Sequence, residues 1–213
     1  MIRDGVGRLR LIRAEAGPER RLAAAFRRSV FFGRRQVLFD EVEEARRDRY
    51  GYVFLLLDGR AVLATARVLP YPSALSPIRE LDGDFASGSA DSEVGRIAAI
   101  RTPIGFRASL LLLTLGALWM RAHTRHERYL AHCHPKLLEL YRQVGARDLN
   151  VTCVVPGRLE AHAVVTGSYD DAGRRGLQRL GIEQTEAAEM LACSSSPLGV
   201  EPRPCAESAS RMT

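Results

Sequence analysis

Several residue types that define common functional motifs are scarce in this chain of 213 residues. Lys136 is the only lysine among 31 basic residues, so no glycine-rich phosphate loop ending in lysine is present. The four cysteines lie far apart and form no CxxC pair, which favours free thiols over a disulfide framework. No GxSxG segment marks a serine hydrolase. Aromatic residues are not interleaved with the arginines, which argues against nucleic-acid binding.

The histidines do not form a recognised metal pattern. His123 and His126 are three residues apart near a predicted helix end, and His132 and His134 flank Cys133. This spacing matches no specific zinc motif and lacks the i, i+4 separation of an HExxH helix. The sequence therefore predicts no metal and no tightly bound cofactor.

Length and composition predict one folded domain with a tail. The hydrophobic content of 46% is enough for a core. We assign residues 1–192 to the domain and expect residues 193–213, rich in serine, proline and small residues, to be disordered. The apolar run Leu110–Met120 is interrupted by Thr114 and Gly116, so we expect no membrane span. No apolar signal segment follows Met1, which favours a cytoplasmic location.

The net charge of +6 comes almost entirely from arginine. Arginines are concentrated before residue 50, where they could form a patch that docks an acidic protein partner. The alternative is a set of solvated helix faces, because glutamates and Asp48 are interspersed with them. The arginines concerned are Arg20, Arg21, Arg27, Arg28, Arg34, Arg35, Arg46, Arg47 and Arg49.

Hydrophobic periodicity and turn residues predict an α/β fold with the order β-α-α-β-β-β-α-β-α-β-β. The sheet should be mixed, antiparallel in its first part and parallel around the two later helices, with helices on both faces. The predicted strands are 9–12, 52–57, 61–68, 92–100, 129–132, 149–155 and 159–165, and the predicted helices are 19–32, 40–49, 106–123, 135–145 and, weakly, 170–190.

The segment Ser92–Arg101 carries the best candidate chemistry. Glu93 and Arg96 would point to opposite faces of a regular strand, but a bulge at Gly95 would bring them toward one side. Such a bulge also frees a backbone N–H that can hold an oxyanion, so Glu93 becomes a candidate general base and Arg96 a candidate for positioning an anion. The alternative is a Glu–Arg pair that only stabilises the strand.

Two further positions have both a functional and a structural interpretation. Gly105, Arg107 and Ala108 begin a predicted helix whose free N–H groups suit a phosphate or an amide, although a single glycine is a weak motif. Tyr141 lies on an apolar helix face, where its phenol could protonate a leaving thiolate or could simply be part of the core.

With these elements in place, the chain resembles the GNAT acyltransferase superfamily, and within it the N-acyl amino acid synthases and the autoinducer (acyl-homoserine lactone) synthases. The resemblance implies a GNAT-like, centrally splayed sheet and covers roughly residues 8–165. Three motifs carry it: Arg27-Arg28-Ser29-Val30-Phe31, Ala66-Arg67-Val68-Leu69-Pro70 and Glu93-Val94-Gly95-Arg96-Ile97-Ala98.

Departures from the motifs favour one branch. Autoinducer synthases usually have a tryptophan where Val37 lies here, and their acidic second segment is only loosely matched by Asp40 and Asp48. The stretch from His134-Pro135 through Tyr141 to Gly145 instead resembles the N-acyl amino acid synthases. A non-catalytic module that binds acyl chains or carrier protein, and a generic acetyl-CoA acetyltransferase, remain alternatives.

The resemblance implies transfer of a long-chain acyl group from acyl carrier protein, or less readily from coenzyme A, to the α-amine of an amino acid such as tyrosine. It implies catalytic roles for Glu93, Arg96 and Tyr141. The residues implied in substrate binding are Arg27, Phe31, Arg67, Gly95, Ile97, Ala98, Arg101, Gly105 and Arg107.

Overall fold

The computed structural model describes residues 9–15, 17–35, 40–80, 90–154 and 161–192. The strands are β1 (Leu9–Arg13), β2 (Tyr52–Asp58), β3 (Ala61–Pro70), β4 (Ser92–Ala99), β5 (Arg128–Cys133), β6 (Arg147–Val154) and β7 (Ala161–Ser168). The helices are α1 (Gly17–Arg35), α2 (Glu41–Tyr50), α3 (Pro103–His123), α4 (Leu138–Gln143), α5 (Tyr169–Leu180) and α6 (Gln184–Ala192). The predicted order of elements is confirmed. The expected disorder of residues 193–213 lies outside the described residues.

All seven strands form one sheet in the order β1-β2-β3-β4-β5-β7-β6. Every neighbouring pair is antiparallel except β4 and β5. The prediction of parallel pairing around both later helices is therefore right for α3 and wrong for α4. The reason is that β7 folds back as a hairpin partner of β6 and inserts between β5 and β6, which a linear pattern of elements cannot reveal.

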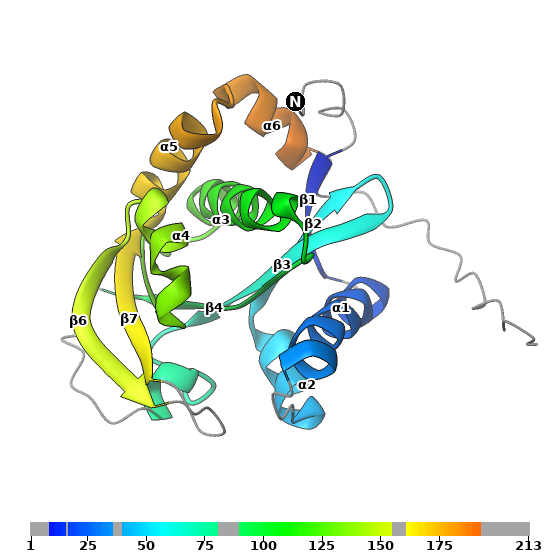
Figure 1. The fold of residues 1–213 in the computed structure, drawn as a ribbon. Helices are drawn as coiled ribbons and strands as arrows, with labels where there is room; N and C mark the ends of the chain where they lie inside the picture. Colours follow the sequence, from blue (N-terminus) through cyan, green and yellow to red (C-terminus); the bar gives the residue numbers. More distant parts are fainter. Residues whose placement is uncertain (1–8, 16, 36–39, 81–89, 155–160, 193–213) are drawn as a thin grey trace, which may run out of the picture.

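Helices cover both faces of this sheet, as predicted. Figure 1 shows α1 and α2 on one face and α3, α4, α5 and α6 on the other. Apolar contacts follow the same division, because Val53, Leu55 and Leu57 of β2 pack with Ala23 of α1 whereas Phe54 and Leu56 face α3. The strand β2 is buried on both faces, which explains its unbroken apolar sequence.

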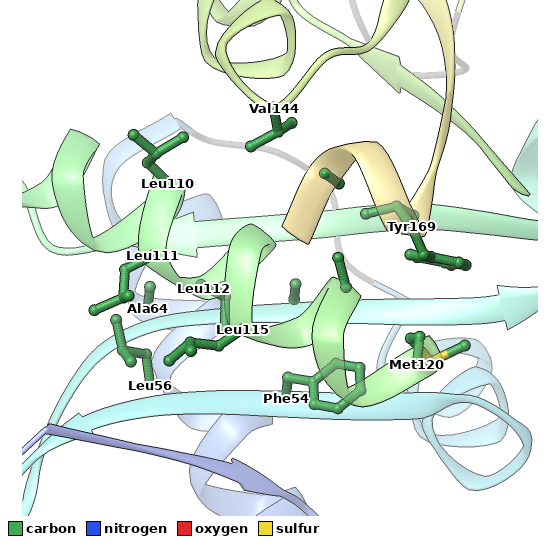
Figure 2. Close-up of a cluster of buried hydrophobic side chains, with 14 of the residues drawn as sticks. Phe54, Leu56, Ala64, Leu110, Leu111, Leu112, Leu115, Met120, Val144 and Tyr169 are labelled. Carbon is green, nitrogen blue, oxygen red and sulfur yellow. The ribbon is translucent and has the colours of Figure 1, made fainter. Parts of the chain in front are cut away.

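The helix α3 forms the centre of the larger core. Figure 2 shows Leu111 and Leu115 beside Leu56 of β2, while Leu110 lies near Val144 after α4. The helix begins at Pro103, three residues before the predicted start, because proline is favoured in the first turn. With 21 residues it is long and apolar enough to cross a membrane by length and composition, yet 67% of the apolar window is buried inside the fold. It is the core helix of this domain.

The sheet splays apart between β4 and β5. Their parallel pairing is limited to Ser92 with Tyr129 and Glu93 with Leu130, after which β4 continues to Ala99 with no strand partner on that side among the described residues. The predicted splayed sheet is confirmed, and Glu93 lies where the two strands separate.

Candidate active site

Glu93 is buried, and only one of its two carboxyl oxygens accepts the hydrogen bonds that hold it. Ser76 Oγ and the backbone N–H of Ile78 both donate hydrogen bonds to its Oε2, the second at 3.2 Å. Only 2% of the residue is exposed. Burial raises the pKa of Glu93 above its usual value, although the two hydrogen bonds and the charge of Arg67 act in the opposite direction. A carboxylate with a raised pKa is a stronger base than one in water.

A bulge at Arg96 and Ile97 interrupts β4, and it begins three residues after Glu93. Thr65 pairs with Ala98 and Arg67 pairs with Gly95, so Ala66 alone faces two residues of β4. The predicted bulge is present, but its left-handed residue is Arg96, with a φ of 53°, and not Gly95. The predicted position is wrong because glycine, although it tolerates positive φ most readily, is not the residue that adopts it in this bulge.

The bulge turns Arg96 toward the α1 and α2 face of the sheet. Its guanidinium donates twice to Oε1 of Glu44 and lies 5.9 Å from the ring centre of Phe31. Glu93 pairs with Leu69, two residues after Arg67 on β3, so Glu93 lies on the same face of the sheet as Arg67. Glu93 and Arg96 therefore serve one face of the sheet, as predicted, with different immediate partners.

Arginines from all three motifs converge on two acidic residues of α2. Arg27 pairs with Asp48, and Arg67 donates to Glu44 at 2.9 Å and to Asp48 at 3.1 Å. Burial alone would raise the pKa of Glu44, but the nearby charges of Arg67 and Arg96 outweigh it and hold that pKa below its usual value. The five side chains form a buried charge cluster that ties α1 and α2 to β3 and β4.

This cluster revises two expectations about the N-terminal charges. Arg27 and Arg47 are buried and cannot contribute to a surface patch, whereas Arg21, Arg28, Arg46 and Arg49 are exposed. The side chains of Arg34 and Arg35 lie outside the described residues. Asp40, expected to match the acidic segment, instead caps α2 by accepting from the N–H groups of Val42 and Glu43.

Small and apolar residues lie on both faces of the sheet at the bulge. Ala98 packs with Val30 and Phe31 of α1, and Ile97 packs against the larger core under α3. These contacts position the motif residues Phe31, Ile97 and Ala98 around the bulge, and their predicted role in substrate binding stays a prediction.

The start of α3 offers fewer free N–H groups than predicted. Pro103 has no N–H, and that of Gly105 donates to the Thr102 carbonyl at 2.8 Å. A Cβ at Gly105 would lie 1.9 Å from the carbonyl oxygen of Ile100, so the glycine is required by packing. Arg107 donates to the carbonyl of Leu180, and Arg101 is exposed beside the turn. The expectation of a free N–H at Gly105 is wrong.

Tyr141 lies on α4 and is part of the larger hydrophobic core around α3. Only 2% of it is exposed, and burial raises the pKa of its phenol well above the usual value, with further contributions from Cys133, Tyr129 and Glu93. The phenol is therefore protonated at neutral pH, as a proton donor to a thiolate must be. Its catalytic role stays a prediction.

The structure adds four residues that sequence reasoning did not place at the site. They are Ser76, Glu44, His132 and His162. Glu44 could have been found, because it precedes Asp48 by one helical turn and shares its face. Ser76 follows an irregular proline-rich stretch and gave no signal. Within the described residues, no three histidine, cysteine or acidic side chains gather as metal ligands.

The fold of this chain is similar to that of several solved structures. FeeM, an N-acyl amino acid synthase from uncultured soil microbes, is 15% identical in sequence; the alignment covers 83% of this chain and 99% of FeeM, with a TM-score of 0.63. The chain has the GNAT fold. The comparisons with protein-family models and with curated proteins found no match, so the likeness is one of structure.

Acyl-homoserine lactone synthases share the same GNAT fold. The coenzyme A-dependent synthase BjaI, solved with SAM and isopentyl-CoA, is 17% identical over 85% of this chain and 97% of its own, with a TM-score of 0.58. The coenzyme A-dependent synthase MesI is 16% identical over 83% and 96%, with a TM-score of 0.57. The predicted fold is confirmed. The fold alone does not distinguish N-acyl amino acid synthases from acyl-homoserine lactone synthases.

Proposed function

We propose that this protein is an N-acyltransferase that moves a long-chain acyl group from a carrier-protein thioester to the α-amine of an amino acid. The observation that carries the proposal is Glu93, a buried carboxyl with a raised pKa at the point where β4 and β5 separate. The solved structures with the same fold include an N-acyl amino acid synthase, which supports the proposal.

In the proposed reaction, Glu93 accepts a proton from the α-ammonium of the acceptor. An α-ammonium has a pKa near 8, and one carboxylate with a raised pKa is sufficient to deprotonate it. The amine nitrogen then attacks the thioester carbonyl, the C–N bond forms and the C–S bond breaks. A backbone N–H of the bulge holds the oxyanion, and the phenol of Tyr141 protonates the departing thiolate.

The start of α3 supports a protein-bound donor over free coenzyme A. A pyrophosphate needs several free N–H groups at a helix N-terminus. Here Pro103 has none to offer and Gly105 has already donated its own to Thr102. The exposed arginines of α1 and α2, Arg21, Arg28, Arg46 and Arg49, would instead contact an acidic carrier protein.

An autoinducer synthase is the second candidate. The observation that favours it is the presence of acyl-homoserine lactone synthases among the solved structures with the same fold. The resemblance of His134, Tyr141 and Gly145 to the N-acyl amino acid synthases still favours an amino acid as acceptor.

Mass spectrometry of lipid extracts from a bacterial host that expresses the protein tests the proposal. We expect N-acyl amino acids such as N-acyl tyrosine, and Glu93→Gln should reduce their amount ~10²–10⁴-fold without loss of folded protein. The matched control is Glu139→Gln, because Glu139 is exposed on α4. Acyl-homoserine lactone in place of acyl amino acid would establish the second candidate. Folded protein with no acylated product would favour a binding module.

A further inference from the structure

Two histidines that the proposed reaction does not use extend from Glu93, the first beside its carboxyl group and the second beside the first. The Nε2 atom of His132 on β5 is 3.9 Å from Oε1 of Glu93, and its Nδ1 atom is 3.1 Å from Nδ1 of His162 on β7. The register explains this contact, because His132 pairs with Val164, two residues after His162, so both rings lie on one face. The three side chains form a row from β4 through β5 to β7.

The short contact between the two Nδ1 atoms restricts their protonation. One ring must carry a proton on Nδ1 and the other must not, because two bare nitrogens or two N–H groups would repel each other. When His132 is neutral and carries its proton on Nδ1, its Nε2 atom is unprotonated, and this is the nitrogen that faces Glu93. A bare imidazole nitrogen beside a carboxyl group is a proton acceptor.

A proton captured by Glu93 needs a route out of the site. Glu93 is 2% exposed, and its Oε2 already accepts from Ser76 and Ile78. The captured proton is therefore best placed on Oε1, the oxygen nearest His132. The side chain of His132 is 16% exposed, so it links the buried carboxyl to solvent.

Building on the proposed function, we propose that His132 and His162 form a proton relay that returns Glu93 to its carboxylate form after each turnover. The proton moves from Oε1 of Glu93 to Nε2 of His132, while the Nδ1 proton of His132 passes to Nδ1 of His162. His132 is then neutral and His162 is an imidazolium. The row resets when Nδ1 of His132 takes its proton back from Nδ1 of His162, and the resulting His132 imidazolium then loses the Nε2 proton to water.

Other titratable groups face this row from β3, β6 and α2. Arg67 of β3 and Arg47 of α2 interact electrostatically with Glu93, and Cys153 of β6 pairs in register with His162. Burial, with a smaller contribution from Glu93, raises the pKa of the Cys153 thiol, which keeps it protonated. The ring of His134 lies 6.3 Å from that of His162. Imidazoles are the groups here whose ordinary pKa lies near neutrality.

Steady-state kinetics with purified protein, acyl-carrier protein and amino acid test the relay. His132→Gln should lower kcat ~10-fold or more while KM changes less than about twofold, and added imidazole should restore part of the rate. His162→Gln should lower kcat in the same direction. The control is His126→Gln, because His126 pairs with Asp91 away from Glu93. Unchanged kcat in His132→Gln would overturn the relay.

A second measurement separates failure of the relay from failure of the proposed function. Nitrogen-15 NMR of the imidazole rings reports the tautomers without any turnover. We expect one Nδ1–H and one bare Nδ1 for His132 and His162, and a lower titration midpoint for His132 in Glu93→Gln, which lacks the neighbouring carboxylate. Two bare Nδ1 atoms at neutral pH, or a midpoint unaffected by Glu93→Gln, would overturn the relay even if the protein acylated no amine.

Discussion

Arg96 donates two hydrogen bonds to the same oxygen of Glu44, from Nε at 3.0 Å and from Nη2 at 2.7 Å. The same carboxylate also accepts from Arg67 at 2.9 Å. One glutamate of α2 thus joins the bulged strand β4 to its neighbour β3. Since Arg96 has a positive φ, this contact also holds a backbone conformation that is unfavourable for a residue with a side chain.

Glu44→Gln should therefore destabilise the protein strongly. The change removes the charge that compensates the buried guanidinium of Arg67, and breaking a buried pair of this kind costs about 3–5 kcal/mol. Urea denaturation measures the effect. Glu41→Gln is the matched control, since Glu41 lies on the same helix as Glu44. It pairs with Arg28 of α1, but both side chains are more than half exposed, and such pairs contribute about 0–1 kcal/mol. Equal stability of the two variants would contradict the role of the charge cluster.

The sequence predicted the residues of this cluster better than their contacts. Arg27, Arg67 and Arg96 stood out through motif resemblance, but nothing in their spacing indicated that all three meet the acidic side chains of α2. That meeting depends on how α1 and α2 pack on the sheet, which is long-range information. Glu44 lies in a helix rich in both charges, and this pattern is also typical of a solvated surface helix, so it does not indicate a buried acidic residue.

The same limit applies to the fold. The hairpin of β2 and β3 was predictable from Asp58-Gly59, where Gly59 has a φ of 59°. The insertion of β7 between β5 and β6 was not, because strand order depends on tertiary pairing that hydrophobic alternation does not encode. The His132–His162 contact exists because β7 lies next to β5. The sequence predicted parallel strands around the helix after β5, and that arrangement does not bring the two histidines together.

Tyr141→Phe should slow the proposed acyl transfer with little effect on stability. Removal of the phenol proton leaves the thiolate without a donor, so we expect a loss of kcat of ~10²-fold, measured as release of free carrier-protein thiol. Tyr129→Phe is the matched control, since Tyr129 is equally buried and its hydroxyl has no hydrogen-bond partner among the described residues. If the two variants turned over at equal rates, Tyr141 would be a core residue only.

Gly176→Ala should destabilise the packing of α5 on α3, although alanine is the better helix former. A Cβ at Gly176 would lie 1.9 Å from Oγ1 of Thr114, which itself donates to Leu110 within α3. Such overpacking typically costs about 1–3 kcal/mol, more than the gain in helix propensity of about 1 kcal/mol. Thermal unfolding measures the sign. Gln178→Ala, an exposed change on the same helix, should leave the melting temperature nearly unchanged. A stabilised Gly176→Ala would mean that the two helices can move apart at no cost.

The ionisation of Glu93 should make the stability difference between wild type and Glu93→Gln depend on pH. Burial raises the pKa of Glu93 in the folded protein, so between its unfolded and folded pKa values the folded state binds more protons than the unfolded state. Wild-type stability must then fall as the pH rises through this window, by up to about 1.4 kcal/mol per pH unit. Glutamine has no such proton to lose, and its amide oxygen can still accept from Ser76 and Ile78. Melting temperatures should therefore be similar near pH 4 and increasingly favour Glu93→Gln above it, whereas Glu139→Gln should track the wild type. A difference that stays constant with pH, or that favours the wild type as the pH rises, would mean that the carboxylate is stabilised in its site, and Glu93 would then be a poorer base than the proposed mechanism requires.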